Sequence, residues 1–415
     1  MCSLLIARHV QRVQQASTVS MATRLLLLLV SAGVIDYVIA SCNLNLQKDF
    51  DTKNAPPVFI TNGKYMAPDL NACGIRLSTR QKILIGCPGA RNAIVYTSRK
   101  GKVQTNLRVL EATCDSGSNF KSSNKNLKKF ALKEISCKEQ PEVTIKKTTK
   151  CGRNNLYQKY NGGYNVGNTF YSLYEACFDE NILTTYFVKH YIHPYSCETQ
   201  QSDKSPSFQV NGMFKGLPIS RLYTMSEQRK RFKEIFGKRQ GAVYTDNNVL
   251  HKGHLASRAD FTLAAELRAS YQYINAAPQW DKVNAPRWSN LERALRVYVN
   301  QKAKKSVTVY TGTHGVLMLP DERGSNKPVY LANVSNKNAV PVPLYFYKVV
   351  VEPGKKTVAY VTINSVFYTS TQIQTLRFCT DLCDGTHWLT WKDKGIESFC
   401  CDYNDFKREV GYSPI

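Results

Sequence analysis

Apolar residues in the first third of the chain fall in short runs that are separated by turn-forming residues. The runs are β-branched or alternate between apolar and polar positions, and three of them are predicted strands: residues 82–86, 93–97 and 103–110. Pro88-Gly89 and Gly101 lie between successive runs, where such residues favour turns. The pattern predicts a small β-rich module in residues 42–155.

The rest of the chain continues the strand pattern. Five further runs are predicted strands: residues 170–177, 184–193, 306–312, 344–351 and 357–364. The last three are apolar on both faces, which is typical of central strands that are covered on each side. Pro353-Gly354 is expected to turn the last two strands into a hairpin.

Two segments have the spacing of amphipathic helices. In residues 226–237, Ser226 is the predicted N-cap and Gly237 the predicted end of a short helix. A longer helix is expected to begin near Pro286, because the missing N–H of proline would have no partner in a first turn. Its apolar stripe recurs at helical spacing: Trp288, Leu291, Leu295 and Tyr298. These elements predict an α+β fold with a mixed or antiparallel central sheet.

Residues 156–168 are rich in Gly, Asn and Tyr, and this composition predicts a domain boundary. We therefore expect the module of residues 42–155 to be followed by a second domain of residues 156–415. A chain of 415 residues with 43% hydrophobic residues is long enough for two domains with proper cores.

The first forty residues have the features of a cleaved secretory signal. Arg24 precedes an apolar run at residues 25–35, and small residues stand just before Cys42. The run is too short for a membrane span. Residues 1–41 are therefore the predicted signal peptide, with Met21 as an alternative start, and the protein is expected to be secreted, extracellular and without a membrane span.

Cysteine usage favours the same destination. Of 13 cysteines, Cys2 lies in the predicted signal, and the other twelve form an even number that suits disulfides in an oxidising compartment. Eight precede residue 200 and four follow residue 378, so the stretch between them cannot use thiol chemistry. A zinc site is the alternative for the last four, but the adjacent pair Cys400-Cys401 suits two disulfides with different partners better.

Basic residues greatly outnumber acidic ones. Lys and Arg total 56 against 31 Asp and Glu, which gives a net charge of +25. Such an excess attracts polyanions, either nucleic acid or an anionic membrane or glycan surface. Lysines are dense in residues 121–153, at the end of the module, where they form either a solvated linker or a second nucleic-acid contact surface.

The pattern with the most chemical content runs from His251 to Arg296. Hydrolysis of a phosphodiester needs a base near neutral pKa and positive charge at the phosphoryl oxygens. His254 is the predicted base, since an unperturbed imidazole is mostly neutral at physiological pH. Asn284 offers one neutral oxygen and would leave most of the octahedral shell of Mg²⁺ to water and phosphate.

Glu292 and Arg296 follow on the predicted helix and are four residues apart, so they share one face and can interact. We expect Glu292 to bind a metal-bound water and Arg296 to hold the phosphate. The alternative is an ordinary surface ion pair.

This stretch resembles the DNA/RNA non-specific endonucleases with a ββα-metal core, specifically their secreted arthropod branch from gut and saliva. The Asp-Arg-Gly-His signature of that family falls on residues 251–254, where Gly253 and His254 match. The family's Asn-x-x-Pro-Gln segment falls on residues 275–279, and its metal-binding Asn falls on Asn284, with Trp288 in place. The likeness covers roughly residues 171–401.

The resemblance implies an endonuclease that requires Mg²⁺, or Mn²⁺ as an alternative, and cleaves DNA and RNA without sequence specificity. The implied residues are His254, Lys252 and Arg296 for catalysis, Asn275, Arg258 and Arg287 for substrate binding, and Asn284 and Glu292 for the metal. Because water and not the ribose 2′-OH would be the nucleophile, both nucleic acids are expected substrates.

Four positions depart from the family pattern. Lys252 replaces an Arg and loses the bidentate fork that grips phosphate, His251 replaces an Asp, Pro286 replaces a Gly, and Ser257 stands where the branch often has Pro. These departures leave open a second hypothesis, a salivary-type protein of the same fold that binds nucleic acid tightly and retains weak nuclease activity. A cationic binder of glycans or membranes is a third, which would leave the nuclease pattern without a purpose.

Overall fold

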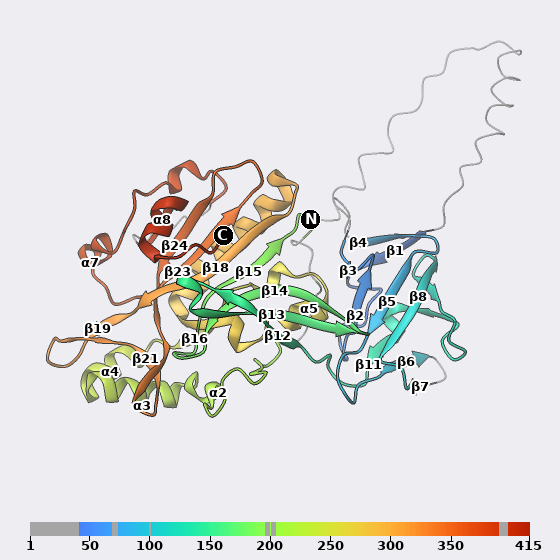
Figure 1. Ribbon diagram of the computed structural model, residues 1–415, viewed down its shortest axis with the longest axis horizontal. Helices are drawn as coiled ribbons and strands as arrows, with labels where there is room; N and C mark the ends of the chain where they lie inside the picture. The colour runs from blue at the N-terminus through green and yellow to red at the C-terminus, as the bar shows by residue number, and fades with distance from the viewer. Residues whose placement is uncertain (1–40, 69–73, 99–100, 196–199, 201–204, 390–396) are drawn as a thin grey trace, which may run out of the picture.

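The computed structural model describes residues 41–68, 74–98, 101–195, 200, 205–389 and 397–415 (Figure 1). The predicted signal peptide, apart from Ser41, and the alternative start at Met21 lie outside the described residues. So do Cys73 and Cys197.

The N-terminal module is built from antiparallel β-sheets. Its six-stranded sheet has the order β10-β9-β8-β5-β2-β3, with bounds Lys129–Ala131, Asn119–Lys121, Val109–Ser116, Lys82–Gly86, Val58–Thr61 and Lys64–Tyr65. A three-stranded sheet has the order β11-β6-β7, with bounds Ile135–Cys137, Ile94–Ser98 and Gly101–Gln104. Strands β1 (Ser41–Asn45) and β4 (Gly74–Ser78) form a further pair. The disulfides Cys42–Cys114 and Cys87–Cys137 link these sheets around a buried apolar core.

One predicted strand of the module is wrong. Residues 103–110 divide between β7 and β8, because Thr105 bends the chain between them. Its hydroxyl donates a hydrogen bond to the carbonyl of Ile94 and accepts one from the backbone N–H of Leu107. The predicted strands at 82–86 and 93–97 are confirmed, the second shifted by one residue.

The second domain contains an eight-stranded antiparallel sheet in the order β12-β13-β14-β15-β18-β23-β24-β25. The bounds are Thr144–Cys151, Tyr157–Val166, Thr169–Asp179, Thr184–Ile192, Val307–Val316, Pro343–Val351, Val358–Ile363 and Ser398–Asp402. All five strands that the sequence predicts after residue 169 are present, and β23 and β24 form the predicted hairpin. The antiparallel sheets and the helices confirm the α+β class.

Most of residues 156–168, where the composition predicts a domain boundary, form strand β13 (Tyr157–Val166) inside this sheet. The glycines serve close packing: a Cβ on Gly162 would lie 2.2 Å from the Tyr174 ring, and one on Gly163 only 1.9 Å from the Tyr171 carbonyl oxygen. Because the lysine-rich strand β12 is the neighbouring edge strand, we propose that the boundary between the domains precedes Thr144. Strands β13 and β14 extend from the sheet toward the module (Figure 1).

Helices cover the sheet and its edges. They are α2 (Ile219–Leu222), α3 (Met225–Phe236), α4 (Lys238–Thr245), α5 (Ala264–Ala269), α6 (Ser289–Tyr298), α7 (Ser370–Thr375) and α8 (Tyr403–Val410). The N-cap of helix α3 is Thr224, two residues before the predicted Ser226, because the hydroxyl of Thr224 accepts the N–H of Glu227. Two hairpins, β19–β20 (Met318–Pro320, Asn326–Pro328) and β21–β22 (Tyr330–Val334, Lys337–Pro341), complete the domain.

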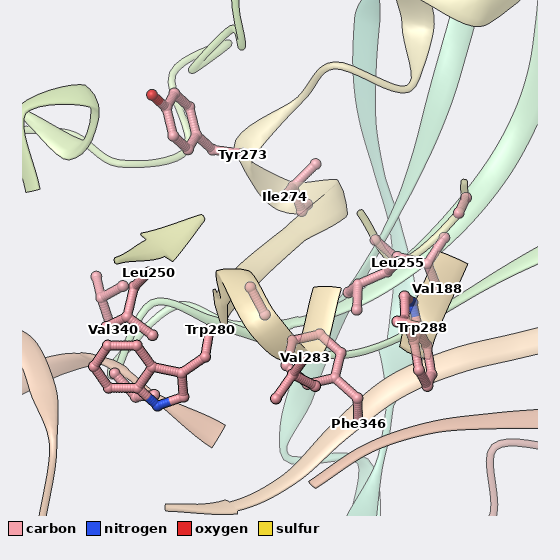
Figure 2. Close-up of a cluster of buried hydrophobic side chains, with 14 of the residues drawn as sticks. Val188, Leu250, Leu255, Tyr273, Ile274, Trp280, Val283, Trp288, Val340 and Phe346 are labelled. Carbon is pink, nitrogen blue, oxygen red and sulfur yellow. The ribbon is translucent and has the colours of Figure 1, made fainter. Parts of the chain in front are cut away.

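The apolar core of this domain lies directly behind the segment that carries the candidate chemistry. Figure 2 shows Trp280, Val283 and Trp288 from this segment packed with Phe346 of β23. Trp288 and Phe346 meet edge to face at 5.7 Å, and both are fully buried. Of the predicted stripe, Trp288, Leu291 and Leu295 are buried and Tyr298 is partly buried, and the stripe anchors the helix on the central sheet.

Disulfides lie at both edges of the large sheet, at strands β12 and β25. Cys151 pairs with Cys177, Cys379 with Cys401, and Cys383 with Cys400. The adjacent cysteines thus form two bridges with different partners, as predicted, and the zinc alternative is wrong because all four thiols are consumed. No helix in the described ranges is long and apolar enough to cross a membrane.

Candidate active site

The site is a β-hairpin followed by a helix. Strands β16 (Leu250–His254) and β17 (Ala276–Trp280) pair antiparallel, and the chain then enters the π-helical segment η7 (Val283–Trp288) and α6. Gly253 is required by the close approach of the two strands, since a Cβ there would lie 2.4 Å from Oε1 of Gln279. The predicted general base, His254, stands at the end of β16.

The His254 imidazole is enclosed by aromatic rings. The ring centroids of Phe208 and Tyr271 lie 4.9 and 4.8 Å from it. Its Nε2 is buried and has no hydrogen-bond partner among the described residues. Burial, reinforced by the charge of Arg258, lowers the pKa of His254 to about 4, so the ring is neutral at physiological pH. A neutral imidazole is the form that accepts a proton from water, but its pKa lies below the near-neutral value expected from the sequence, so the enclosed ring is a weaker base.

Lys252 lies on the same face of β16, two residues before His254. Its Nζ is 5.4 to 6.0 Å from the ring centroids of Phe208, Tyr223 and Tyr273. Burial lowers the pKa of Lys252, while the three π faces favour its charged form. The sequence indicated a phosphate-binding cation here, but not that aromatic rings surround it.

Asp260 connects two elements of the site. It lies in η5 (Arg258–Asp260), fully buried, where Oδ2 accepts from His190 Nε2 at 2.8 Å and Oδ1 accepts from Arg296 Nη1 at 2.8 Å. Burial alone would raise the pKa of Asp260, but the His190 hydrogen bond and the Arg296 charge outweigh it and hold the pKa well below its usual range. Arg296 is thereby held in one orientation. The alternative of an ordinary Glu292–Arg296 ion pair is wrong, because Arg296 pairs with Asp260.

Glu292 bonds elsewhere. Its Oε2 accepts from the hydroxyl of Ser257 at 2.8 Å, and its Oε1 lies 3.9 Å from Nζ of Lys348. Lys348 is fully buried in β23, donates to Thr311 Oγ1 at 2.8 Å and lies over the Trp288 ring. Burial lowers the pKa of Lys348 and raises that of Glu292, although each charge opposes the shift of the other.

Lys348 is absent from the predicted site. The only sequence signal for it is a lysine inside the apolar strand 343–351, where a charge is costly unless it has a partner. Asp260 and His190 were also missed as site residues, since neither belongs to a motif.

Two predicted substrate-binding residues have other roles. Asn275, in η6 (Tyr273–Asn275), is completely buried, and its amide makes three hydrogen bonds to backbone groups of Ala256 and Ser270. It therefore positions the loop that follows His254 and leaves no group for substrate. Arg287 forms an ion pair with Glu397 at 3.2 Å, which directs it toward β25.

Arg258 and Asn284 are better placed for ligands. Arg258 is partly exposed in η5 and near enough to His254 for its charge to lower the pKa of the imidazole. Asn284 is partly exposed in η7, and its amide has no hydrogen-bond partner among the described residues. An amide oxygen that is free in this way fits a hard divalent cation, with Glu292 as an acceptor for a water on that cation.

A family model matches the part of the chain that carries this site. Residues 152–412 match the model described as DNA/RNA non-specific endonuclease. The chain belongs to this family. The match covers the eight-stranded sheet except its edge strand β12, together with the whole ββα segment, and the family is a class of divalent-metal-dependent nucleases.

Individual relatives come from insect saliva. The chain is 28% identical to a salivary endonuclease of Lutzomyia longipalpis over 288 residues, 67% of this chain and 66% of that protein, which is just under two thirds. It is 25% identical to salivary protein Tsal2A of Glossina morsitans morsitans over 391 residues, which covers 91% and 93% of the two chains. A salivary endonuclease of Culex quinquefasciatus is 25% identical over 287 residues, with 67% and 72% covered.

Proposed function

We propose that the protein is a secreted endonuclease that hydrolyses phosphodiester bonds of DNA and RNA without sequence specificity and with Mg²⁺ as cofactor. The observation that carries this proposal is the buried Nε2 of His254, which has no partner among the described residues and belongs to a neutral imidazole at the end of a ββα hairpin. Most buried polar atoms in folded proteins have a partner, and a catalytic role is one explanation for an atom that has none.

In this mechanism His254 accepts the proton of the attacking water, and the enclosure by Phe208 and Tyr271 keeps the ring in place. Asn284 would hold the metal, and Glu292 would orient one of its waters. When bound, the metal supplies positive charge to the phosphoryl oxygens and the leaving oxygen.

The protein's own cations complete the site. Arg296, fixed by Asp260, faces the phosphate with its remaining N–H groups, and Arg258 adds charge beside the base. Buried Lys348 offsets the charge of Glu292 and limits the electrostatic cost of placing that carboxylate next to a phosphate.

A second function is favoured by one observation, the position of Lys252. An ammonium held among three rings is a weaker phosphate ligand than a guanidinium fork. On this hypothesis the protein binds nucleic acid tightly and cleaves it slowly. Its +25 charge serves both alternatives equally.

The test measures cleavage and binding on one preparation. Supercoiled plasmid and single-stranded RNA are incubated with Mg²⁺ or EDTA, and gel shifts are measured in EDTA. We expect cleavage of both substrates that EDTA abolishes. His254→Ala should lose about 100-fold or more of the rate, since general base catalysis contributes that much, and keep binding within a few-fold.

His387→Ala, at an exposed histidine, is the matched control and should cleave like the wild type. Cleavage by His254→Ala at the wild-type rate would remove the imidazole from the mechanism. Tight binding with cleavage barely above background would favour the binding protein.

A further inference from the structure

A cavity of about 490 Å³ lies at the junction of the module and the nuclease domain, and none of the roles above uses it. The turn between β2 and β3 lines it from the module side, with Lys64 and Tyr65. The end of β15 and the chain after η5 line it from the nuclease side. The wall is firm, because the Tyr65 hydroxyl donates to the carbonyl of Tyr171 at 2.7 Å and apolar residues of both domains pack there.

Three rings form a stacked series along one side of the cavity. Tyr191 and His193 are 6.2 Å apart with ring planes at 23°, and His193 and Tyr195 are 4.9 Å apart at 17°. Tyr191, at the outer end, is 49% exposed although it is a large aromatic residue. Burial lowers the pKa of His193 to about 4, so the middle ring is neutral. An exposed ring at the end of such a series presents a π face on which a planar ligand can stack.

A buried acid lies deeper in the cavity wall. Glu266 is 7% exposed, one oxygen lies 3.5 Å from the backbone N–H of Thr262, and Oε1 has no partner among the described residues. Burial raises the pKa of Glu266 to about 8, so the carboxyl keeps its proton near neutral pH. A protonated carboxyl has a donor and an acceptor side by side, which complements the polar edge of a nucleobase.

The cavity adjoins the active site. Asp260 is one of its lining residues, and the buried carboxylate of Asp260 holds Arg296. Lys64 stands exposed at the rim, close enough to His193 for its charge to act on the imidazole. A strand whose phosphate is bound at Arg296 therefore has an aromatic surface and a cation within reach of a neighbouring nucleotide.

We propose that this junction cavity binds one unpaired nucleobase of the nucleic-acid strand, stacked on Tyr191 with a phosphate at Lys64. The inference rests on the proposed function, since it concerns the form of the same substrate. A paired base has both faces covered by its neighbours in the helix. The protein therefore prefers single-stranded or locally unpaired substrate to regular duplex.

The experiment uses a single-stranded DNA 12-mer that carries one 2-aminopurine, titrated into the full-length protein in EDTA, so that no cleavage occurs. Stacking on Tyr191 should quench the fluorescence, and the same base in a duplex should be quenched much less. Tyr191→Ala should bind the single strand on the order of 10-fold more weakly, since one base–aromatic stack contributes at least that much, and Tyr191→Phe should bind like the wild type. Tyr330→Ala, at a partly exposed tyrosine of β21, is the matched control.

A quench and an affinity that are equal in Tyr191→Ala and the wild type would overturn the proposal, as would equal losses in Tyr330→Ala. Free 2-aminopurine nucleotide is titrated in parallel, and binding as tight as that of the 12-mer would show a mononucleotide site and overturn the strand assignment. Lys64→Gln removes the positive charge proposed to bind the phosphate and leaves the stacked rings of Tyr191, His193 and Tyr195 unchanged. If the quench depends on Tyr191 but the protein never cleaves plasmid, the proposed endonuclease function is refuted and the base-binding cavity is not.

Discussion

The N-terminal module and the catalytic segment hold their shapes by different means. Two disulfides, Cys42–Cys114 and Cys87–Cys137, link the sheets of the module around an apolar core. The catalytic segment, residues 250–298, has no cysteine and depends on buried polar contacts, of Asp260 with Arg296 and of Glu292 with Lys348. Disulfides stabilise a domain mainly by restricting its unfolded chain, so substitutions at the surface leave their effect unchanged. Buried charges stabilise the fold only while every partner is present. Single substitutions should therefore have larger effects on cleavage in the catalytic segment.

The largest expected effect follows from Asp260→Asn. The change removes the charge that holds Arg296 and accepts from His190. We expect cleavage to fall by about 100-fold or more, because Arg296 loses its fixed orientation. The free energy of unfolding should fall by about 3–5 kcal/mol, as when one partner of a buried ion pair is removed. Plasmid cleavage and denaturant unfolding measure the two.

Asp246→Asn is the control, because Asp246 is exposed and its contact with Arg229 is 4.0 Å long. It should match the wild type in both assays. Equal behaviour of the two variants would show that the buried network does not maintain the site.

The pH dependence of kcat/KM tests the burial of His254. A base is active when deprotonated, and the pKa of this imidazole is lowered to about 4. The rate should therefore stay level from about pH 8 down to about pH 5 and fall by about tenfold per pH unit below the pKa. Circular dichroism at each pH separates this loss from unfolding. If kcat/KM instead begins to fall at about pH 6.5, the pKa of an exposed imidazole, the result would contradict the burial of the His254 ring.

Lys252→Arg should have a smaller effect, in the opposite direction. A guanidinium stacks on the rings of Phe208 and Tyr273 and still presents two N–H groups to a phosphate. We expect kcat to rise by about 10-fold if the recovered interaction is near 1.4 kcal/mol, with little change in affinity. Single-turnover cleavage measures this. If the wild type cleaves rapidly and Lys252→Arg cleaves no faster, the hypothesis of an attenuated site is wrong.

The smallest effect on cleavage is expected from the double variant Cys87→Ala/Cys137→Ala. Loss of this disulfide, which spans 50 residues, should destabilise the module by about 2–5 kcal/mol. Plasmid cleavage should change by less than about threefold, since the module supplies none of the catalytic groups proposed above. Thermal unfolding and cleavage are measured on the same sample. A loss of cleavage as large as that in Asp260→Asn would mean that the two regions are not independent.

Local patterns determined much of this protein. Alternating and apolar runs predicted the strands of the large sheet, because a strand buried on one face alternates apolar and polar residues and a strand buried on both faces is apolar throughout. The spacing of Trp288, Leu291 and Leu295 predicted the buried face of α6. Gly253 and His254 could be found from their motif, since a close approach of two strands and the proposed base are needed at adjacent positions.

Composition was misleading where packing decided the outcome. The Gly-rich residues 156–168 have the composition of a domain boundary, but most of them form strand β13 inside the sheet. Gly162 is needed there because the Tyr174 ring occupies the space that a Cβ would fill. The polar residue Asn275 belongs to a binding motif, but burial commits its amide to the backbone. Composition describes residue types and not the space around them.

Only the tertiary structure decided which charges meet. His190 and Asp260 are 70 residues apart, and Lys348 lies 93 residues from the Leu255 carbonyl that it contacts. Pairings of this kind depend on the order of strands in the sheet, which the hydrophobic pattern of a single strand does not specify. The rings around Lys252 and the junction cavity arise in the same way, because each is assembled from several elements. The sequence alone therefore determined the elements and indicated His254 as the candidate base, and the fold determined the electrostatic environment of the site.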